Sequence, residues 1–287
     1  MKVSEIRNRI NSVFPSVKIQ DLQKNPTGQN NDVYIADGDI VYRFPKYVEG
    51  IEKMRKEVRV LNHVKEKVSL PVPDPLYMNI HTEDVGRVFI GYPRIEGIPL
   101  WKESFNTIEN EDVLKHLASQ LGGFLKDLHS TSADGIFTNQ NEPPGCRVKQ
   151  LYINIQNDLF PYMNEKAKAR ITSRFNRFIG YGVSIDSVLI HGDFGASNIL
   201  WSSHNHQITG IIDFGETSYG DPAYDFAGLA ASYGDEFTIK CLEHYFDDDR
   251  IFDRAKFYQS TFALQEALHG LRNKNDQAFE NGMKDYL

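Results

Sequence analysis

Cysteines and long apolar runs are both scarce in this sequence. Cys146 and Cys241 are the only cysteines among 287 residues, too few for a disulfide framework and without a metal-binding spacing. No apolar run approaches the roughly 18 residues that a membrane span needs, and residues 1–15 lack the apolar core of a signal peptide. We therefore expect a cytoplasmic protein with reduced thiols and no membrane partner.

Repeats, low-complexity segments and an excess of positive charge are also absent. A nucleic-acid partner would require a basic surface, whereas the formal net charge of this chain is −7. The hydrophobic fraction (40%) and the charged fraction (25%) are those of an ordinary globular protein. At this length the chain forms one large domain or two modest ones with ample core. We expect a monomer that binds no nucleic acid.

Apolar periodicity and turn residues predict the local structure. Helices are expected at residues 3–14, 51–64, 113–128, 152–181 (as one or two), 222–233, 236–245, 250–271 and 277–286. Strands are expected at residues 17–19, 33–36, 40–44, 88–92, 199–201 and 207–212, with a loop at 131–147. The last two strands form a hairpin with Asn198 and Asp213 at opposite ends of the paired strands. Pro222 begins a helix that the Asp221 carboxylate caps.

The stretch that carries chemistry is a His-x-Asp-x-x-x-x-Asn segment from His191 to Asn198, followed by an Asp-Phe-Gly triplet that starts at Asp213. This spacing is typical of phosphoryl transfer from a nucleotide. Asp193 can accept a hydrogen bond from an incoming hydroxyl group. The Asn198 carbonyl and the Asp213 carboxylate are hard oxygen ligands suited to Mg²⁺, whereas His191 braces the loop. Average residue usage gives both halves together by chance about once in 10⁵ such chains.

The motif resembles that of the aminoglycoside phosphotransferase family, because Gly192 stands where protein kinases carry arginine. Residues 209–215 and 220–226 share the resemblance, which extends from residue 41 to the C-terminal helices and is closest to the branch that phosphorylates a 2″-hydroxyl. It implies an α+β, protein-kinase-like fold of two lobes. Residues 1–92 would form a small β-rich N-lobe with one main helix, residues 93–97 a hinge, and residues 98–287 a larger, mostly helical C-lobe.

The resemblance also implies a nucleotide site for ATP or GTP with Mg²⁺. Arg43 stands where kinases place the strand lysine and would hold the α- and β-phosphates, with Glu57 holding Arg43. Lys46 is a rival for the phosphate role, because the arginine fork and the lysine ammonium differ in geometry. Backbone groups of the hinge would bind the purine at Pro93, Arg94 and Ile95.

Gly28 lies in the turn that would cover the phosphates. Backbone amides near Gly28 can form an anion-binding nest. The full Gly-x-Gly-x-x-Gly pattern is absent, however, and an ordinary hairpin turn remains the alternative. The segment from Asp221 to Asp225 braces the catalytic loop in the family.

Acidic residues are concentrated in the second half of the chain. Between Asp186 and Asp253 there are 13 acidic residues against Lys240 and Arg250 alone. This excess is either a solvated surface or a field that attracts a cationic small molecule. Besides Asp193, the resemblance implies that Asp235, Glu236, Glu243 and Glu266 lie along the acceptor cleft, and a solvated surface position is the alternative for each of these four acids.

Four functions remain open. The first is Mg²⁺-dependent transfer of the nucleotide γ-phosphate to a hydroxyl of an aminoglycoside, an antibiotic-resistance activity. The second is the same transfer to another small hydroxyl compound, such as a macrolide or a choline-like metabolite. A protein kinase is disfavoured by Gly192 and by the lack of Ala-Pro-Glu after Asp-Phe-Gly. An inactive nucleotide-binding module is disfavoured by the intact Asp193, Asn198 and Asp213.

Overall fold

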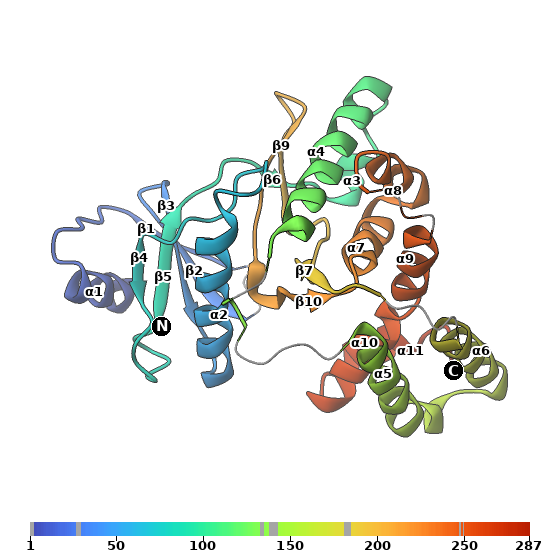
Figure 1. Cartoon of the computed structure of the whole chain (residues 1–287). Helices are drawn as coiled ribbons and strands as arrows, with labels where there is room; N and C mark the ends of the chain where they lie inside the picture. Colours follow the sequence, from blue (N-terminus) through green and yellow to red (C-terminus); the bar gives the residue numbers. More distant parts are fainter. Residues whose placement is uncertain are drawn as a thin grey trace.

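A strand-rich lobe lies beside a larger helical lobe (Figure 1). The computed structural model describes residues 3–26, 30–132, 135–137, 143–180, 185–246, 248 and 250–287. Within these ranges, no helix is both long enough and apolar enough to span a lipid bilayer. The expected α+β, kinase-like arrangement of two lobes is confirmed.

The N-terminal lobe is built on a five-stranded antiparallel sheet with the strand order β1-β2-β3-β5-β4. Strands β2 and β3 form the expected hairpin, and its turn contains Asp37 and Gly38, both with positive φ. The elements of this lobe are α1 (Val3–Val13), β1 (Leu22–Asn25), β2 (Asn31–Ala36), β3 (Ile40–Pro45), α2 (Val48–Val64), β4 (Tyr77–Asn79) and β5 (Phe89–Pro93).

The two faces of this sheet bury different side chains, because successive residues of a strand point to opposite faces. On β3, Tyr42 and Phe44 pack with Ile6 and Ile10 of α1. The intervening Arg43 points to the opposite face, where it meets Glu57 of α2. The alternation along β3 therefore aims the arginine at the face covered by α2, which lies toward the helical lobe (Figure 1).

The C-terminal lobe holds two small sheets within a set of helices. Its strands are β6 (Ile98–Pro99), β7 (Val188–Ile190), β8 (Ile199–Ser202), β9 (Gln207–Ile211) and β10 (Ser218–Gly220). Its helices are α3 (Lys102–Phe105), α4 (Glu111–Ser130), α5 (Pro144–Asp158), η1 (Phe160–Tyr162), α6 (Glu165–Gly180), η2 (Phe214–Glu216), α7 (Ala223–Tyr233), α8 (Asp235–Leu242), α9 (Ile251–Gln259), α10 (Phe262–Arg272) and α11 (Asp276–Met283).

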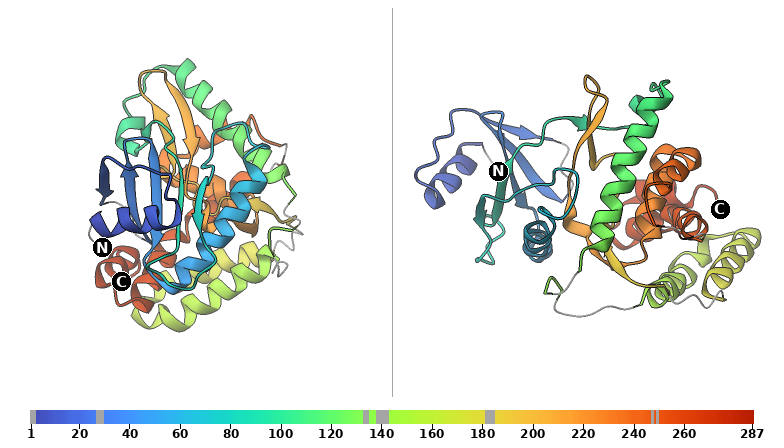
Figure 2. Two further views of the ribbon diagram at one scale, coloured as in Figure 1. Left: turned by 90° about the vertical axis from the view of Figure 1, so that its left-hand side faces the viewer. Right: turned by 45° about the horizontal axis from the view of Figure 1, so that its top comes forward.

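The hairpin of β8 and β9 lies against the long helix α4 in both views (Figures 1 and 2), and the Gln120 side chain on α4 accepts a hydrogen bond of 2.8 Å from the Ile208 amide. Helix α2 contributes to both lobes: Ile51 and Met54 pack on the N-terminal sheet, whereas Leu61 and Val64 belong to the large C-terminal core. One rigid helix thus connects the sheet that carries Arg43 to the lobe that carries the catalytic loop.

Three expected elements differ from the structure. The helix expected at 250–271 is two helices, since Ser260 and Thr261 hydrogen-bond to carbonyls three residues earlier at the break. The loop expected at 131–147 ends sooner, because α5 begins at Pro144, a residue that suits a first helical turn. Residues 17–19 form no strand; Ile19 packs into the apolar cluster under α1 instead.

Two adjacent glycines of α4 test the packing of this helix against α8. A Cβ atom on Gly122 would lie 2.2 Å from the Cys241 carbonyl oxygen, whereas a Cβ atom on Gly123 would have no neighbour within 4 Å. We expect Gly122→Ala to lower the free energy of unfolding by about 1–3 kcal/mol through overpacking. Gly123→Ala should raise it by about 0.5–1 kcal/mol, the difference in helix propensity. Urea unfolding of both variants measures this, and equal shifts would contradict it.

Candidate active site

One buried carboxylate fixes the backbone of the catalytic loop, residues 191–198. Asp225, in the first turn of α7, accepts hydrogen bonds from the His191 amide (2.8 Å) and the Gly192 amide (2.9 Å). Its Oδ2 atom also lies 3.0 Å from His129 Nε2 at the end of α4. Asp225 and His129 side chains are fully buried. The expected bracing of the loop by the 221–225 segment is therefore present in the structure.

Gly192 and His191 explain why the loop has its shape. Gly192 has φ +83°, and a Cβ atom there would lie 2.5 Å from the Glu216 carbonyl oxygen, so no larger residue fits. His191 Nδ1 accepts from the Asp193 amide (3.2 Å), which leaves Nε2–H to donate to the Ile212 carbonyl (3.1 Å). His191 is completely buried and braces the loop as the sequence predicts.

Asn198 orients the Asp193 side chain. Its Nδ2 atom donates to both the Asp193 carbonyl (2.8 Å) and Asp193 Oδ2 (2.9 Å). Because both amide protons are used on Asp193, the Asn198 Oδ1 atom is left to face an incoming cation. Burial raises the pKa of the Asp193 carboxyl from its ordinary value of 3.8, while His191 and the hydrogen bond from Asn198 act in the opposite direction.

Asp213 lies next to Asn198, although not as the sequence predicted. The strands pair with Ile199 opposite Ile211, and the Ile212 amide donates to the Asn198 carbonyl (2.9 Å). Asn198 and Asp213 are thus at the same end of the hairpin, rather than at opposite ends, because the chain reverses between antiparallel strands.

Arg43 joins Asp213 to the N-terminal lobe. Its Nη1 atom lies 2.5 Å from Glu57 Oε1, and its Nη2 atom lies 3.1 Å from Asp213 Oδ1. The predicted pairing of Arg43 with Glu57 is confirmed. Burial opposes the charge on the guanidinium, but the Glu57 carboxylate holds the pKa of Arg43 well above its ordinary value. Burial also raises the pKa of Glu57, and the adjacent Arg43 offsets part of that effect.

The side-chain oxygens of Asn198 and Asp213 are of the type that could hold a divalent cation. The Asp213 side chain is 48% exposed, so part of its carboxylate stays accessible beside Arg43. Among the described residues there is no cluster of three or more histidine, cysteine or acidic side chains that would hold a metal alone. In nucleotide-dependent enzymes, Mg²⁺ binds through one or two carboxylates together with phosphate oxygens and water.

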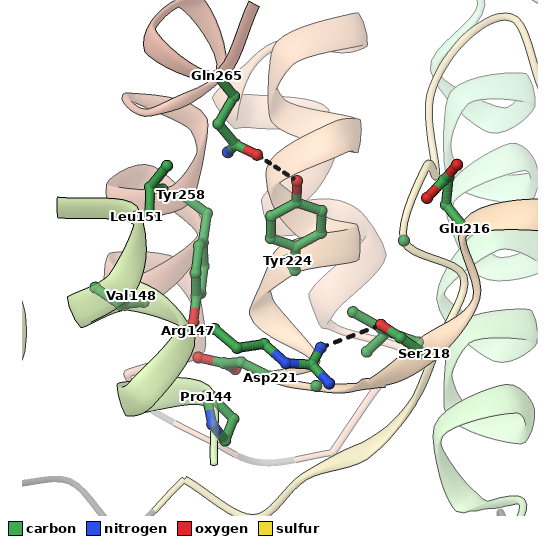
Figure 3. A pocket seen from close by; sticks show the side chains of 13 residues that line it. Pro144, Arg147, Val148, Leu151, Glu216, Ser218, Asp221, Tyr224, Tyr258 and Gln265 are labelled. Atoms are coloured by element: carbon green, nitrogen blue, oxygen red, sulfur yellow. Dashed lines mark hydrogen bonds between the residues drawn. The ribbon is translucent and has the colours of Figure 1, made fainter. Parts of the chain in front are cut away.

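Two cavities adjoin the loop that carries Asp193, and Gly192 lines both. The smaller cavity, of ≈ 290 Å³, lies between α5, β10, α7 and the helices that follow (Figure 3). The other, of ≈ 320 Å³, is bounded by the catalytic loop, α7 and α10 and includes Asp193. Gly192, Tyr224 and Gln265 line both cavities. The Tyr224 hydroxyl donates to Gln265 Oε1 (3.3 Å) between them. A molecule with a hydroxyl at Asp193 can therefore extend past Tyr224 into the smaller cavity.

The acids expected at the acceptor cleft do not line these cavities. Asp235 pairs with Lys256 (2.7 Å) and Glu236 with Lys240 (3.4 Å), while Glu243 and Glu266 are exposed elsewhere. Their role in acceptor binding stays a prediction that the two cavities do not support. The sequence analysis did not identify the residues that do line the cavities, because four separate segments supply them. The uncharged stretch 227–232, which contributes Gly228, Ala231 and Ser232, was the only sequence signal for this wall.

The remaining predicted nucleotide residues lie at opposite ends of two inner strands of the N-terminal sheet, because β3 and β5 are antiparallel and Pro93 pairs with Ile40. Lys46 is exposed at the end of β3. Pro93 ends β5, and the Arg94 amide donates to the Asp39 carbonyl (2.6 Å), so only Ile95 of the proposed hinge residues keeps its N–H for a base. Gly28 falls outside the described residues.

A second ion pair that the sequence analysis missed stabilises the start of α7. Asp221 Oδ1 accepts from the Ala223 amide (3.0 Å), the cap that the sequence predicts. Arg254 of α9 donates to both Asp221 oxygens (3.2 and 3.0 Å) and to Asp248. Burial raises the pKa of Asp221, whereas Arg254 lowers it.

A lobe with a buried arginine–glutamate pair, followed by a lobe with a His-Gly-Asp loop and an Asp-Phe-Gly turn, defines a phosphotransferase of kinase-like fold. The model of the phosphotransferase enzyme family matches residues 21–258, and the chain belongs to this family.

Three known proteins show the extent of the similarity in sequence and in structure. Viomycin phosphotransferase of Streptomyces vinaceus is 27% identical over 197 residues, which cover 67% of each chain. The GDP and kanamycin complex of APH(2")-IIia is 25% identical and superposes with a TM-score of 0.89, covering 99% of this chain and 97% of the other. A macrolide 2'-phosphotransferase from Brachybacterium faecium shares the fold with a TM-score of 0.75 at 18% identity, covering 94% of each chain.

The contact between Arg43 and Glu57 predicts how substitution of either residue changes the affinity for nucleotide. Each of Arg43→Ala and Glu57→Ala should weaken nucleotide binding, and the double variant should lose less than the sum of the two, because the residues act as a unit. Calorimetric titration of ATP and GTP measures all three, with the exposed Lys46→Ala variant as the control. Additive losses, or a larger loss in Lys46→Ala, would transfer the phosphate role to Lys46.

Proposed function

We propose that this protein transfers the γ-phosphate of ATP or GTP, with Mg²⁺, to a hydroxyl group of a small-molecule antibiotic, with an aminoglycoside as the first candidate acceptor. The observation that carries the proposal is the contact set from Glu57 through Arg43 to Asp213, adjacent to Asn198 and Asp193 at the mouth of the cavities. The complexes of the similar enzyme with GDP and kanamycin support both the donor and the acceptor class.

The chain's own residues divide the work. Arg43 neutralises phosphate charge, and Glu57 keeps its guanidinium fixed. Asp213 and Asn198 would hold Mg²⁺, which supplies charge neutralisation on the transferring phosphate. Asp193 accepts a hydrogen bond from the acceptor hydroxyl and takes its proton late. Such catalysis consists mainly of positioning and electrostatic stabilisation.

A macrolide, or another acceptor with few charges, is the second candidate. The cavity next to Asp193 is walled by Tyr224, Phe262, Gly228 and Ala231, and Asp193 is its only acidic residue among those described. This lining favours apolar contact with the acceptor over the binding of several ammonium groups.

We expect Asp213→Ala to abolish the Mg²⁺ dependence of nucleotide binding, together with turnover, because the phosphates would lose the cation between them. Nucleotide titrations with Mg²⁺ and with a chelator measure the effect. Asp276→Ala removes an exposed carboxylate at the start of α11 and serves as the control. Unchanged Mg²⁺ dependence in Asp213→Ala would rule out the assigned metal ligand.

We expect Asp193→Asn to keep its nucleotide affinity while kcat falls by at least about 10²-fold, the scale of losing a positioned proton acceptor. In the unmodified protein, the raised pKa of Asp193 places the acid limb of kcat/KM above pH 3.8, because activity requires the ionised carboxylate and is lost as pH falls through that pKa. A variant with most of its kcat, or with the same acid limb, would make Asp193 a structural residue.

A further inference from the structure

One basic side chain lines the smaller of the two cavities. Arg147, in the first turns of α5, reaches across the cavity to β10, where its Nη1 atom donates to Ser218 Oγ at 3.3 Å (Figure 3). The residue is exposed and only one hydrogen bond to Ser218 uses the guanidinium, so donors remain for a ligand. Among the described residues, no carboxylate lies within 4.0 Å of it.

The carboxylates of the same cavity are compensated by basic partners. Glu216 lies 2.5 Å from Lys53 of α2, and Asp221 is 2% exposed and held by Arg254. For a polyamine bound in these two cavities, the carboxylates within reach would be Asp193, which the reaction needs, and Glu216, which already pairs with Lys53. The polyamine would also meet the positive charge of Arg147.

We propose that Arg147 is a specificity-determining residue, which donates hydrogen bonds to a carbonyl or carboxylate oxygen of the acceptor and disfavours acceptors that place an ammonium group at this end. The inference rests on the proposed phosphotransfer, because it takes the acceptor hydroxyl to lie at Asp193. The two cavities adjoin, because Gly192, Tyr224 and Gln265 line both, and the proposal takes one acceptor to span them. The planar guanidinium of arginine presents its N–H donors in a fixed geometry, so it binds a ligand oxygen with more defined geometry than a lysine ammonium would.

The test uses Arg147→Gln, Arg147→Lys and a matched control, Lys149→Gln. Lys149 is also exposed on α5 and lies about 200° around the helix from Arg147, outside the cavity lining. The probes are kanamycin, a polycation, and erythromycin, a lactone with a single amine. Their dissociation constants are measured by calorimetry with a non-hydrolysable ATP analogue and Mg²⁺, at low salt and at about 0.5 M salt.

Arg147→Gln should tighten kanamycin binding by about threefold to fivefold at low salt, the scale of an exposed charge interaction, and the gain should fade at high salt. The same variant should weaken erythromycin binding by a similar factor. Arg147→Lys should still disfavour kanamycin, and Lys149→Gln should change neither constant. Opposite effects on two ligands would not follow from a general loss of structure.

Equal shifts in Arg147→Gln and Lys149→Gln, including no shift in either, would overturn the role of Arg147. Mg²⁺-dependent nucleotide binding is measured on the same samples. If it were absent from the unmodified protein, the phosphotransfer proposal itself would fail, so the two failures are distinguishable.

Discussion

The buried contact of Arg43 with Glu57 and Asp213 is the interaction on which the active site depends. It brings together a strand, a helix and a loop from two lobes. A buried guanidinium that lost Glu57 would leave an uncompensated charge, which costs about 3–5 kcal/mol. The position of α2 is therefore tied through Arg43 to the position of Asp213, the proposed metal ligand. A displacement of α2 from the sheet would take Glu57 away from Arg43 and leave the guanidinium on β3 without its buried partner.

The second constraint is the Asp225 carboxylate below the catalytic loop. It binds two consecutive loop amides and the His129 side chain, so the loop is oriented by α7 and α4 together. Gly228 of α7 would place a Cβ atom 2.3 Å from the Phe194 carbonyl oxygen, which shows how closely α7 approaches the loop. Asp193, the proposed catalytic residue, thus projects from a backbone that is fixed on two sides, as positioning catalysis requires.

Charge counts along the chain mislead about the acceptor site. The region from residue 186 to 253 is strongly acidic in sequence, but much of that charge is paired in space with Lys53, Arg254 and Lys256, which lie outside it. A paired carboxylate contributes little to a long-range field at ordinary salt. The cavity that includes Asp193 has aromatic walls and no other charged residue among those described.

The sequence by itself determined the motif spacing from His191 to Asp213 and most helices, and the family resemblance that it carries implied the pairing of Arg43 with Glu57. Only the tertiary structure decided that Arg43 reaches Asp213, 170 positions away, and that Asp225 binds the amides of the loop. It also decided which acids are paired and that Arg147, Tyr224 and Gln265 line one cavity. The physical reason is that such contacts depend on the direction in which separate elements pack, which no local periodicity encodes.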